Sequence, residues 1–296
     1  MRTFFTLSAA VIALGASALS AAETYKPFDK QVAAQPRGIV EISNTSGSVE
    51  VTATDRAEVV VHGELGDGVE RVDVTSEPDR TVIKVVLPSH SSRDGDAKLR
   101  VQVPKDSELH LATVSADASI TGVLGVQRLN AVSGNVTTEI AGADLELKTV
   151  SGDVKVRGHG QAARLYVSTV SGDVHLDHGA GDLETSSVSG DLLLSLNSAR
   201  SVHARTTSGD LRFEGKLTRG ASFDAASVSG DLNVRASAEG GYAYEISTFS
   251  GDISNCFDAR VDKKSVGQSL SGSRAEGAGH MRLKTMSGDI ELCDRN

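Results

Sequence analysis

The sequence predicts an all-β protein that folds as a parallel β-solenoid (β-helix) of 18–21-residue, two-strand coils with an N-terminal β cap region. A Ser-Gly-Asp tripeptide recurs at nearly constant spacing, and the residues on both sides of each copy alternate between apolar and polar. This alternation is typical of strands with one buried face, and helical periodicity is absent. A unit of this length cannot bury its apolar face alone, whereas stacked units can share one continuous core.

The chain begins with a segment that we expect to be a signal peptide. In residues 1–22 a single Arg2 precedes an apolar run from Phe4 to Leu19, and small residues end at Ala22. This pattern is typical of secretory signals. No later apolar stretch is long enough for a transmembrane span. We therefore expect an exported protein that is periplasmic, extracellular or on the cell surface.

Two segments separate this signal from the regular repeats. We expect residues 23–37 to form a loose lead-in and residues 38–105 to form an N-terminal β region that caps the solenoid. Ser46-Gly47-Ser48 already has the apolar flanks of a repeat, but the register loosens between residues 57 and 104. Solenoid ends need closure against edge-to-edge association, which explains a less regular segment there.

Residues 106–296 are the predicted repeat solenoid. Copies of Ser-Gly-Asp begin at Ser151, Ser171, Ser189, Ser208, Ser229, Ser250 and Ser287, and variants begin at Ser115 and Ser133. Gly supplies a corner conformation that a Cβ would penalise, and the residue two positions before the Ser is small, as a crowded inner corner requires. The region 258–279 lacks apolar residues at the inward positions around Ser271-Gly272-Ser273, so we expect an insertion loop.

The two cysteines occupy equivalent repeat positions. Cys256 lies six residues after Ser250, and Cys293 lies six residues after Ser287. If these two units are adjacent coils, the Cα atoms lie about 4.8 Å apart, which a disulfide tolerates. An exported protein is also in an oxidising compartment. We expect a Cys256–Cys293 disulfide, with two free thiols as the alternative.

The repeated aspartates form a predicted ladder along one edge of the solenoid. Its members are Asp153, Asp173, Asp191, Asp210, Asp231, Asp252 and Asp289. Stacked carboxylates about 5 Å apart in water repel by roughly 0.8 kcal/mol per neighbouring pair, so something must offset the repulsion. Main-chain N–H donors in the turn are the interpretation we favour, and Ca²⁺ ligation is the alternative.

The repeated Val-Ser-Gly-Asp-Val/Leu units, after a signal segment and a short β-rich lead-in, resemble the bacterial "putative adhesin" β-strand-repeat family, known as domain of unknown function 4097. The resemblance covers about residues 38–296. It implies an exported β-solenoid associated with envelope or surface functions and with envelope stress. It brings no shared set of catalytic residues and no cofactor.

Composition narrows the function further. The formal net charge of -9 disfavours nucleic-acid binding, and 4% aromatic residues with no Trp argue against a sugar-stacking cleft. No persuasive catalytic or metal-ligating constellation is present, so no enzyme, cofactor or metal is expected. We expect a non-enzymatic, adhesin-like or envelope-stress-associated scaffold that binds an envelope protein, a peptide or a glycan. The alternative is a polysaccharide-degrading β-helix enzyme, which needs clustered carboxylates in a groove.

Overall fold

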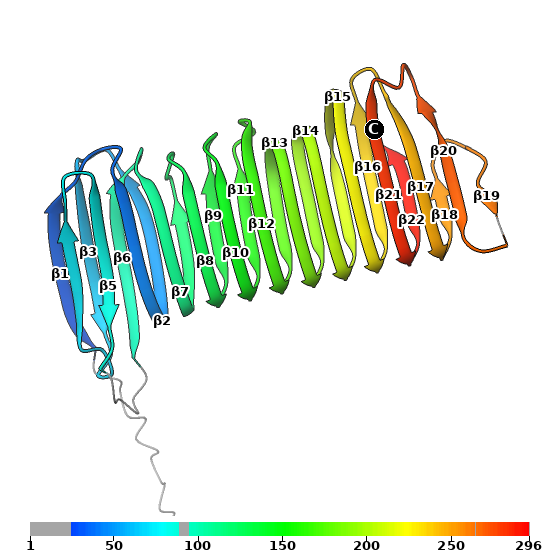
Figure 1. The fold of residues 1–296 in the computed structure, drawn as a ribbon. Helices are drawn as coiled ribbons and strands as arrows, with labels where there is room; N and C mark the ends of the chain where they lie inside the picture. Colours follow the sequence, from blue (N-terminus) through cyan, green and yellow to red (C-terminus); the bar gives the residue numbers. More distant parts are fainter. Residues whose placement is uncertain (1–24, 89–94, 264, 296) are drawn as a thin grey trace, which may run out of the picture.

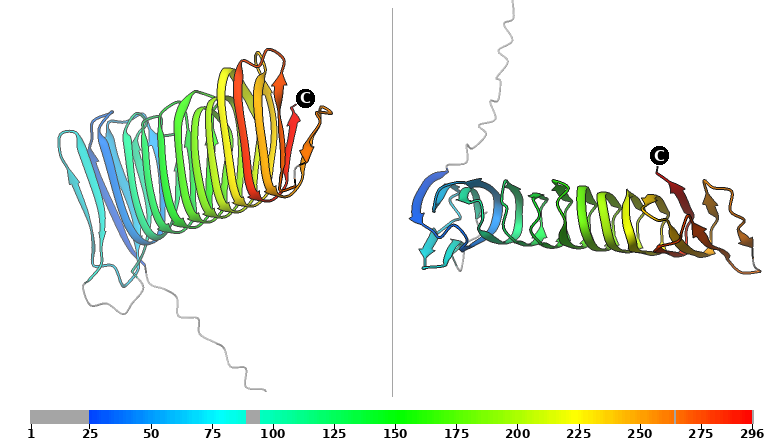
Figure 2. Two further views of the ribbon diagram at one scale, coloured as in Figure 1. Left: turned by 45° about the vertical axis from the view of Figure 1, so that its right-hand side comes forward. Right: turned by 90° about the horizontal axis from the view of Figure 1, so that it is seen from above.

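The computed structural model describes residues 25–88, 95–263 and 265–295, and all regular secondary structure in these ranges is β-strand. The predicted signal segment 1–22 lies outside them. The strands form an elongated, all-β, solenoid-like stack with the N-terminal strands at one end and the C-terminal strands at the other (Figure 1). Seen from above, the chain winds through this stack loop after loop (Figure 2). The described part of the chain contains no helix that could cross a membrane.

The strands fall into three groups along the stack. The N-terminal group is β1 (Lys26–Ala33), β2 (Ile39–Thr54), β3 (Glu58–Leu65), β4 (Arg71–Ser76), β5 (Arg80–Val86) and β6 (Asp96–Pro104). The central group is β7 (Glu108–Thr121), β8 (Gln127–Ser133), β9 (Val136–Ile140), β10 (Leu145–Ser151), β11 (Val154–Gly158), β12 (Ala163–Ser171), β13 (Val174–Ser189), β14 (Leu192–Ser208), β15 (Leu211–Ser229) and β16 (Leu232–Ala238). The C-terminal group is β17 (Tyr242–Ser250), β18 (Ile253–Asn255), β19 (Asp262–Lys263), β20 (Gln268–Arg274), β21 (Gly279–Ser287) and β22 (Ile290–Asp294).

Each central coil has one strand segment before its Ser-Gly-Asp corner and one after it. β10 pairs in parallel with β12, with Leu145 opposite Leu165, and β11 pairs in parallel with β13, with Val154 opposite Val174. Equivalent positions of successive repeats therefore lie side by side. The inward side chains of both strands are buried and belong to one continuous apolar core along the stack.

The glycine of the corner is required for two reasons. Gly190 has a φ of 135°, which L side chains rarely adopt. A Cβ added to it would also lie 2.2 Å from the carbonyl oxygen of Gly172 in the preceding coil. The same contact recurs along the column of corner glycines. The corner sequence is therefore fixed by the close approach of coil to coil as well as by the turn.

The N-terminal end does not follow sequence order. β2 lies between two coils: it pairs in parallel with β7 on one side, and with β5 and β6 on the other. Antiparallel pairings of β4 with β5, β3 with β6 and β1 with β3 then close this end. The prediction of a loose lead-in over residues 23–37 is wrong for Lys26–Ala33, because this segment is a paired strand that covers the edge of β3.

The C-terminal end is rearranged in a similar way. β21 lies between β15 and β17, and β22 lies between β16 and β18, so the last coil of the sequence is inserted between the two preceding coils. The predicted insertion loop 258–279 is wrong for Gln268–Arg274. This segment is strand β20, which pairs antiparallel with β17 and buries Leu270. The prediction failed because it assumed the parallel register of the repeats.

Candidate functional site

The aspartate ladder is held together by hydrogen bonds between coils. The Oδ1 atom of each aspartate except the last accepts a hydrogen bond from the main-chain N–H of the aspartate in the next coil, over distances of 2.8–3.1 Å. The spatial order is Asp153, Asp173, Asp191, Asp210, Asp231, Asp289 and Asp252. Asn135 and Asp117 extend the ladder at one end, and the Gln268 amide donates to Asp252 at the other. These bonds offset the repulsion between neighbouring carboxylates.

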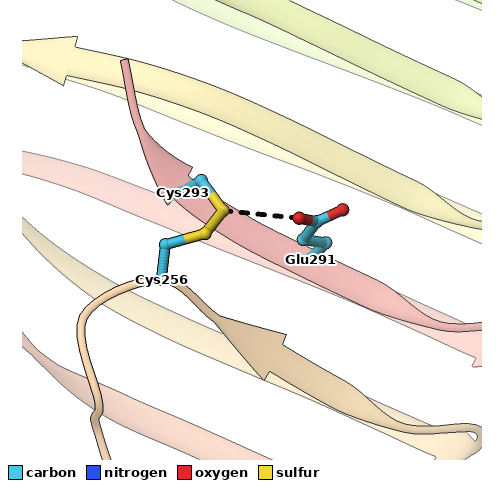
Figure 3. A group of neighbouring side chains, drawn as sticks. All are labelled: Cys256, Glu291 and Cys293. Atoms are coloured by element: carbon cyan, nitrogen blue, oxygen red, sulfur yellow. Dashed lines mark hydrogen bonds between the residues drawn. A yellow bond between two sulfur atoms is a disulfide. The ribbon is translucent and has the colours of Figure 1, made fainter. Parts of the chain in front are cut away.

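One cluster of potential metal ligands occurs among the described residues, and it surrounds the disulfide. Cys256, Glu291 and Cys293 offer ligand atoms within 4.8 Å of one another. The two sulfurs are bonded to each other, with Cα atoms 4.9 Å apart, so neither is a thiolate ligand (Figure 3). The Glu291 carboxylate lies 3.4 Å from the sulfur of Cys293. The structure thus brings the predicted cysteine pair together, and its role is a cross-link between adjacent coils.

The sequence reasoning missed a row of exposed apolar side chains beside the aspartate ladder. The residue immediately before each Ser points outward, because the residue before it is buried and strand residues alternate. In spatial order across nine coils this position holds Val114, Val132, Val150, Val170, Val188, Thr207, Val228, Met286 and Phe249. We call these residues the apolar row. Its valines are 46–49% exposed, Met286 61% and Phe249 64%.

The two sides of the apolar row differ in charge. On the side of the Ser-Gly-Asp corner lies the acidic ladder. On the other side, two residues earlier in each strand, the positions hold Ala112, Asn130, Lys148, Ser168, Ser186, Arg205, Ala226, Lys284 and Ser247. This column is small or basic and has no acidic member. The row therefore runs between an acidic edge and a weakly basic flank.

The row widens at the C-terminal end of the stack. Val228, Met286 and Phe249 line an open cavity of about 450 Å³ together with Val266, which is 59% exposed and lies just before β20. Lys284, Gln268 and several Ser and Thr side chains complete the rim. Contiguous exposed apolar surface of this kind marks interaction sites on proteins.

A larger hollow lies on the outer face of the strand segments that precede the corners. It has a volume of about 760 Å³ and is lined mainly by charged side chains. Most of its charges are paired: Arg164 with Asp144, Arg200 with Asp182, and Lys148 with Glu146. Hydrogen bonds from Arg200 and Lys148 lower the pKa values of Asp182 and Glu146. This hollow, which we call the charged groove, therefore holds ionised carboxylates in ion pairs.

The apolar row had a signal in the sequence. Val stands directly before the Ser in six of the nine repeats, at a position that alternation assigns to the outer face. This repeated apolar residue at an outward position is the signal that predicts an exposed apolar row. The degree of exposure still depends on the corner geometry, which the sequence does not reveal.

Comparison with solved structures returns proteins of low sequence identity. A crystal structure described as a "putative adhesin" from Bacteroides fragilis NCTC 9343 shares 15% identity, covers 90% of this chain and 97% of its own, and has a TM-score of 0.48. A "putative lipid binding protein" from Parabacteroides distasonis ATCC 8503 shares 13% identity over 90% and 96% of the two chains, with a TM-score of 0.48. No curated protein matches the chain.

The family comparison is more informative. The model of the Toastrack DUF4097 family matches residues 39–293 of this chain, from the start of β2 almost to the end of β22. The match includes all central coils and both rearranged ends except β1. The chain belongs to the Toastrack DUF4097 family.

Proposed function

We propose that this protein is an exported, non-enzymatic binding scaffold of the cell envelope, periplasmic or on the cell surface, and that the apolar row is its binding surface. The scaffold is a parallel β-solenoid of two-strand coils closed at both ends by antiparallel strands. The observation that carries the proposal is the run of half-exposed apolar side chains over nine coils, in which Thr207 takes one position. Exposure of apolar side chains to water is unfavourable, and a partner would remove them from it.

Export is supported by two features of the chain. Residues 1–22 have the pattern of a secretory signal, and the disulfide between Cys256 and Cys293 is of the kind that persists in oxidising compartments. The disulfide also joins the coils of β18 and β22, which lie side by side at the C-terminal end of the stack. The same features and membership of the family support an envelope location and an adhesin-like or envelope-stress role.

The alternative, a polysaccharide-degrading enzyme, finds less support in the charged groove. A glycosidase needs a general acid with a raised pKa beside a second carboxylate. Asp182 and Glu146 instead have lowered pKa values, because each accepts a hydrogen bond from a basic neighbour. Tyr166 is the one aromatic residue that lines the groove.

Photo-crosslinking tests the proposal. A photoreactive amino acid replaces Val170 in the apolar row of the purified mature protein, which is then illuminated in an envelope fraction of the source organism. Control protein carries the same group at Lys155, an exposed position on the strand after the corner. We expect adducts, with another copy or with another envelope component, from Val170 and not from Lys155. Equal yields from both positions, or none from either, would refute the proposal.

A further inference from the structure

We infer that the partner of the apolar row is a second copy of this chain, packed row against row with the two solenoid axes parallel and the coils in register. This inference rests on the proposed function and names the partner for the same site. It follows from the spacing of the row, its area and the charges on its two sides.

The spacing of the row favours a partner with the same repeat. Neighbouring side chains of the row belong to hydrogen-bonded parallel strands, so they lie about 4.8 Å apart along the stack. A partner with another spacing meets some of these side chains and misses others. A second copy matches the spacing at every coil, and each side chain of the row then meets its own counterpart across the two-fold axis.

The area of the row is sufficient for a stable dimer. The half-exposed valines, together with Met286, Phe249 and Val266, present on the order of 800 Å² of surface per copy, which is about what each partner contributes to a standard interface. The two large side chains lie at the same end, where the cavity of about 450 Å³ also lies. In a parallel pair these ends meet, so the Phe and Met side chains of the two copies face each other across their cavities.

The charges select the parallel arrangement. A two-fold axis along the stack places the aspartate ladder of one copy opposite the weakly basic flank of its partner. Arg205 of this flank lies in the same coil as Asp210, and Lys284 lies in the same coil as Asp289. A two-fold axis across the stack would place the two acidic ladders opposite each other. Like charges in register repel, so the first arrangement is favoured. The ladder also opposes binding of the row to an anionic membrane surface.

Sedimentation velocity of the purified mature protein, with its disulfide intact, tests for the dimer. We expect a dimer with a dissociation constant of about a micromolar or below, because interfaces of this size range from micromolar to picomolar affinity. The double variant Val132→Lys/Val170→Lys should weaken it at least about tenfold. The matched control Ser119→Lys/Thr137→Lys adds the same charges at exposed positions after the corners of the Val132 coil and of the coil next to it, and should leave the dissociation constant unchanged. A protein that stays monomeric at about 100 μM, or a control that dissociates equally, overturns the inference.

Single cysteines along the row test the register. In the parallel, in-register dimer each of Val114→Cys, Val170→Cys and Val228→Cys lies opposite its own counterpart, so mild oxidation should cross-link all three variants with similar yield. An antiparallel pair would cross-link only near its centre, and that result overturns the arrangement. A monomeric protein that still forms a row-specific adduct with another envelope component refutes the second copy as partner and leaves the binding scaffold standing. Absence of both kinds of association refutes both proposals.

Discussion

At the scale of single residues, the corner glycines carry the strictest requirement in the molecule. In Gly190→Ala the new Cβ would meet the Gly172 carbonyl at 2.2 Å in an already unfavourable φ region. We expect a loss of about 3–5 kcal/mol of unfolding free energy, from backbone strain and from the displaced coil together. Urea denaturation measures it.

The matched control for this substitution is Gly220→Ala. Gly220 has a φ of 75°, but the nearest atom to an added Cβ is the Ala278 oxygen at 4.0 Å. Only the backbone strain remains, so the loss should be about 1 kcal/mol. Equal losses at Gly190 and Gly220 would show that coil-to-coil contact does not determine the corner sequence.

The aspartate ladder makes a second prediction at this scale. Asp191 accepts a hydrogen bond from the Asp210 main chain at 2.9 Å. Asp191→Asn keeps the acceptor oxygen and removes repulsion of roughly 0.8 kcal/mol per neighbour, so its stability should equal or exceed that of the natural protein. Asp191→Ala should lose about 1 kcal/mol, because the N–H of Asp210 loses its partner.

Asn135 already stands in the ladder and accepts from Asp153, which is natural support for the Asn variant. The measurement is the urea midpoint of both variants, with and without Ca²⁺. A Ca²⁺-dependent rise in the midpoint that Asp191→Asn abolishes would support the cation-binding interpretation and contradict the purely structural ladder.

At the scale of elements, the inserted C-terminal coil depends on the disulfide. Cys256 and Cys293 are 37 residues apart in sequence, and closing a loop of that length restricts the unfolded chain by about 3–4 kcal/mol. Reduction, or the double variant Cys256→Ser/Cys293→Ser, should expose β18 and β22 to hydrogen exchange while the central strands keep their protection. Uniform loss of protection along the stack would contradict a local role.

Tyr242, at the start of β17, should make the stability of the same end of the stack depend on pH in the alkaline range. Its hydroxyl donates to Asp294 at 3.1 Å, and burial together with the Asp294 charge raises its pKa. A raised folded-state pKa means that its stabilising contribution is complete below the ordinary tyrosine pKa of about 10 and is lost as the pH rises beyond it. Between pH about 9 and 11, Tyr242→Phe should therefore lose less stability than the natural protein. Parallel pH profiles in chemical denaturation would contradict this assignment.

The order of the coils could not be predicted from the repeats. Because every corner carries nearly the same residues, the sequence predicts that β21 stacks on another coil but not on which one. β17 receives the antiparallel strand β20 on its outer side, so β21 occupies its inner side. The equivalent cysteine positions were sufficient to predict that the two coils touch, since adjacency holds in either order.

At the scale of the whole molecule, the acidity of the chain is concentrated on one edge. Seven aspartates of the ladder account for most of the formal net charge of -9. This edge and the cysteine pair were predictable, because repeated positions share one environment. The apolar row was not assigned, because a Val at an outward strand position is ordinary by itself. Its significance comes from eight apolar side chains at nine aligned positions, an alignment that requires the observed stacking.

The central claim is that the apolar row serves binding and not stability, and the triple variant Val150→Thr/Val170→Thr/Val188→Thr tests it most directly. Thr has the shape of Val, and Thr207 already occupies the row. The measurement is the yield of photo-crosslinked adduct from Val132 in an envelope fraction, beside the thermal midpoint. We predict at least about a tenfold lower yield with a midpoint within about 2 °C of the natural protein. An unchanged yield, or a midpoint that falls by much more, would contradict the account.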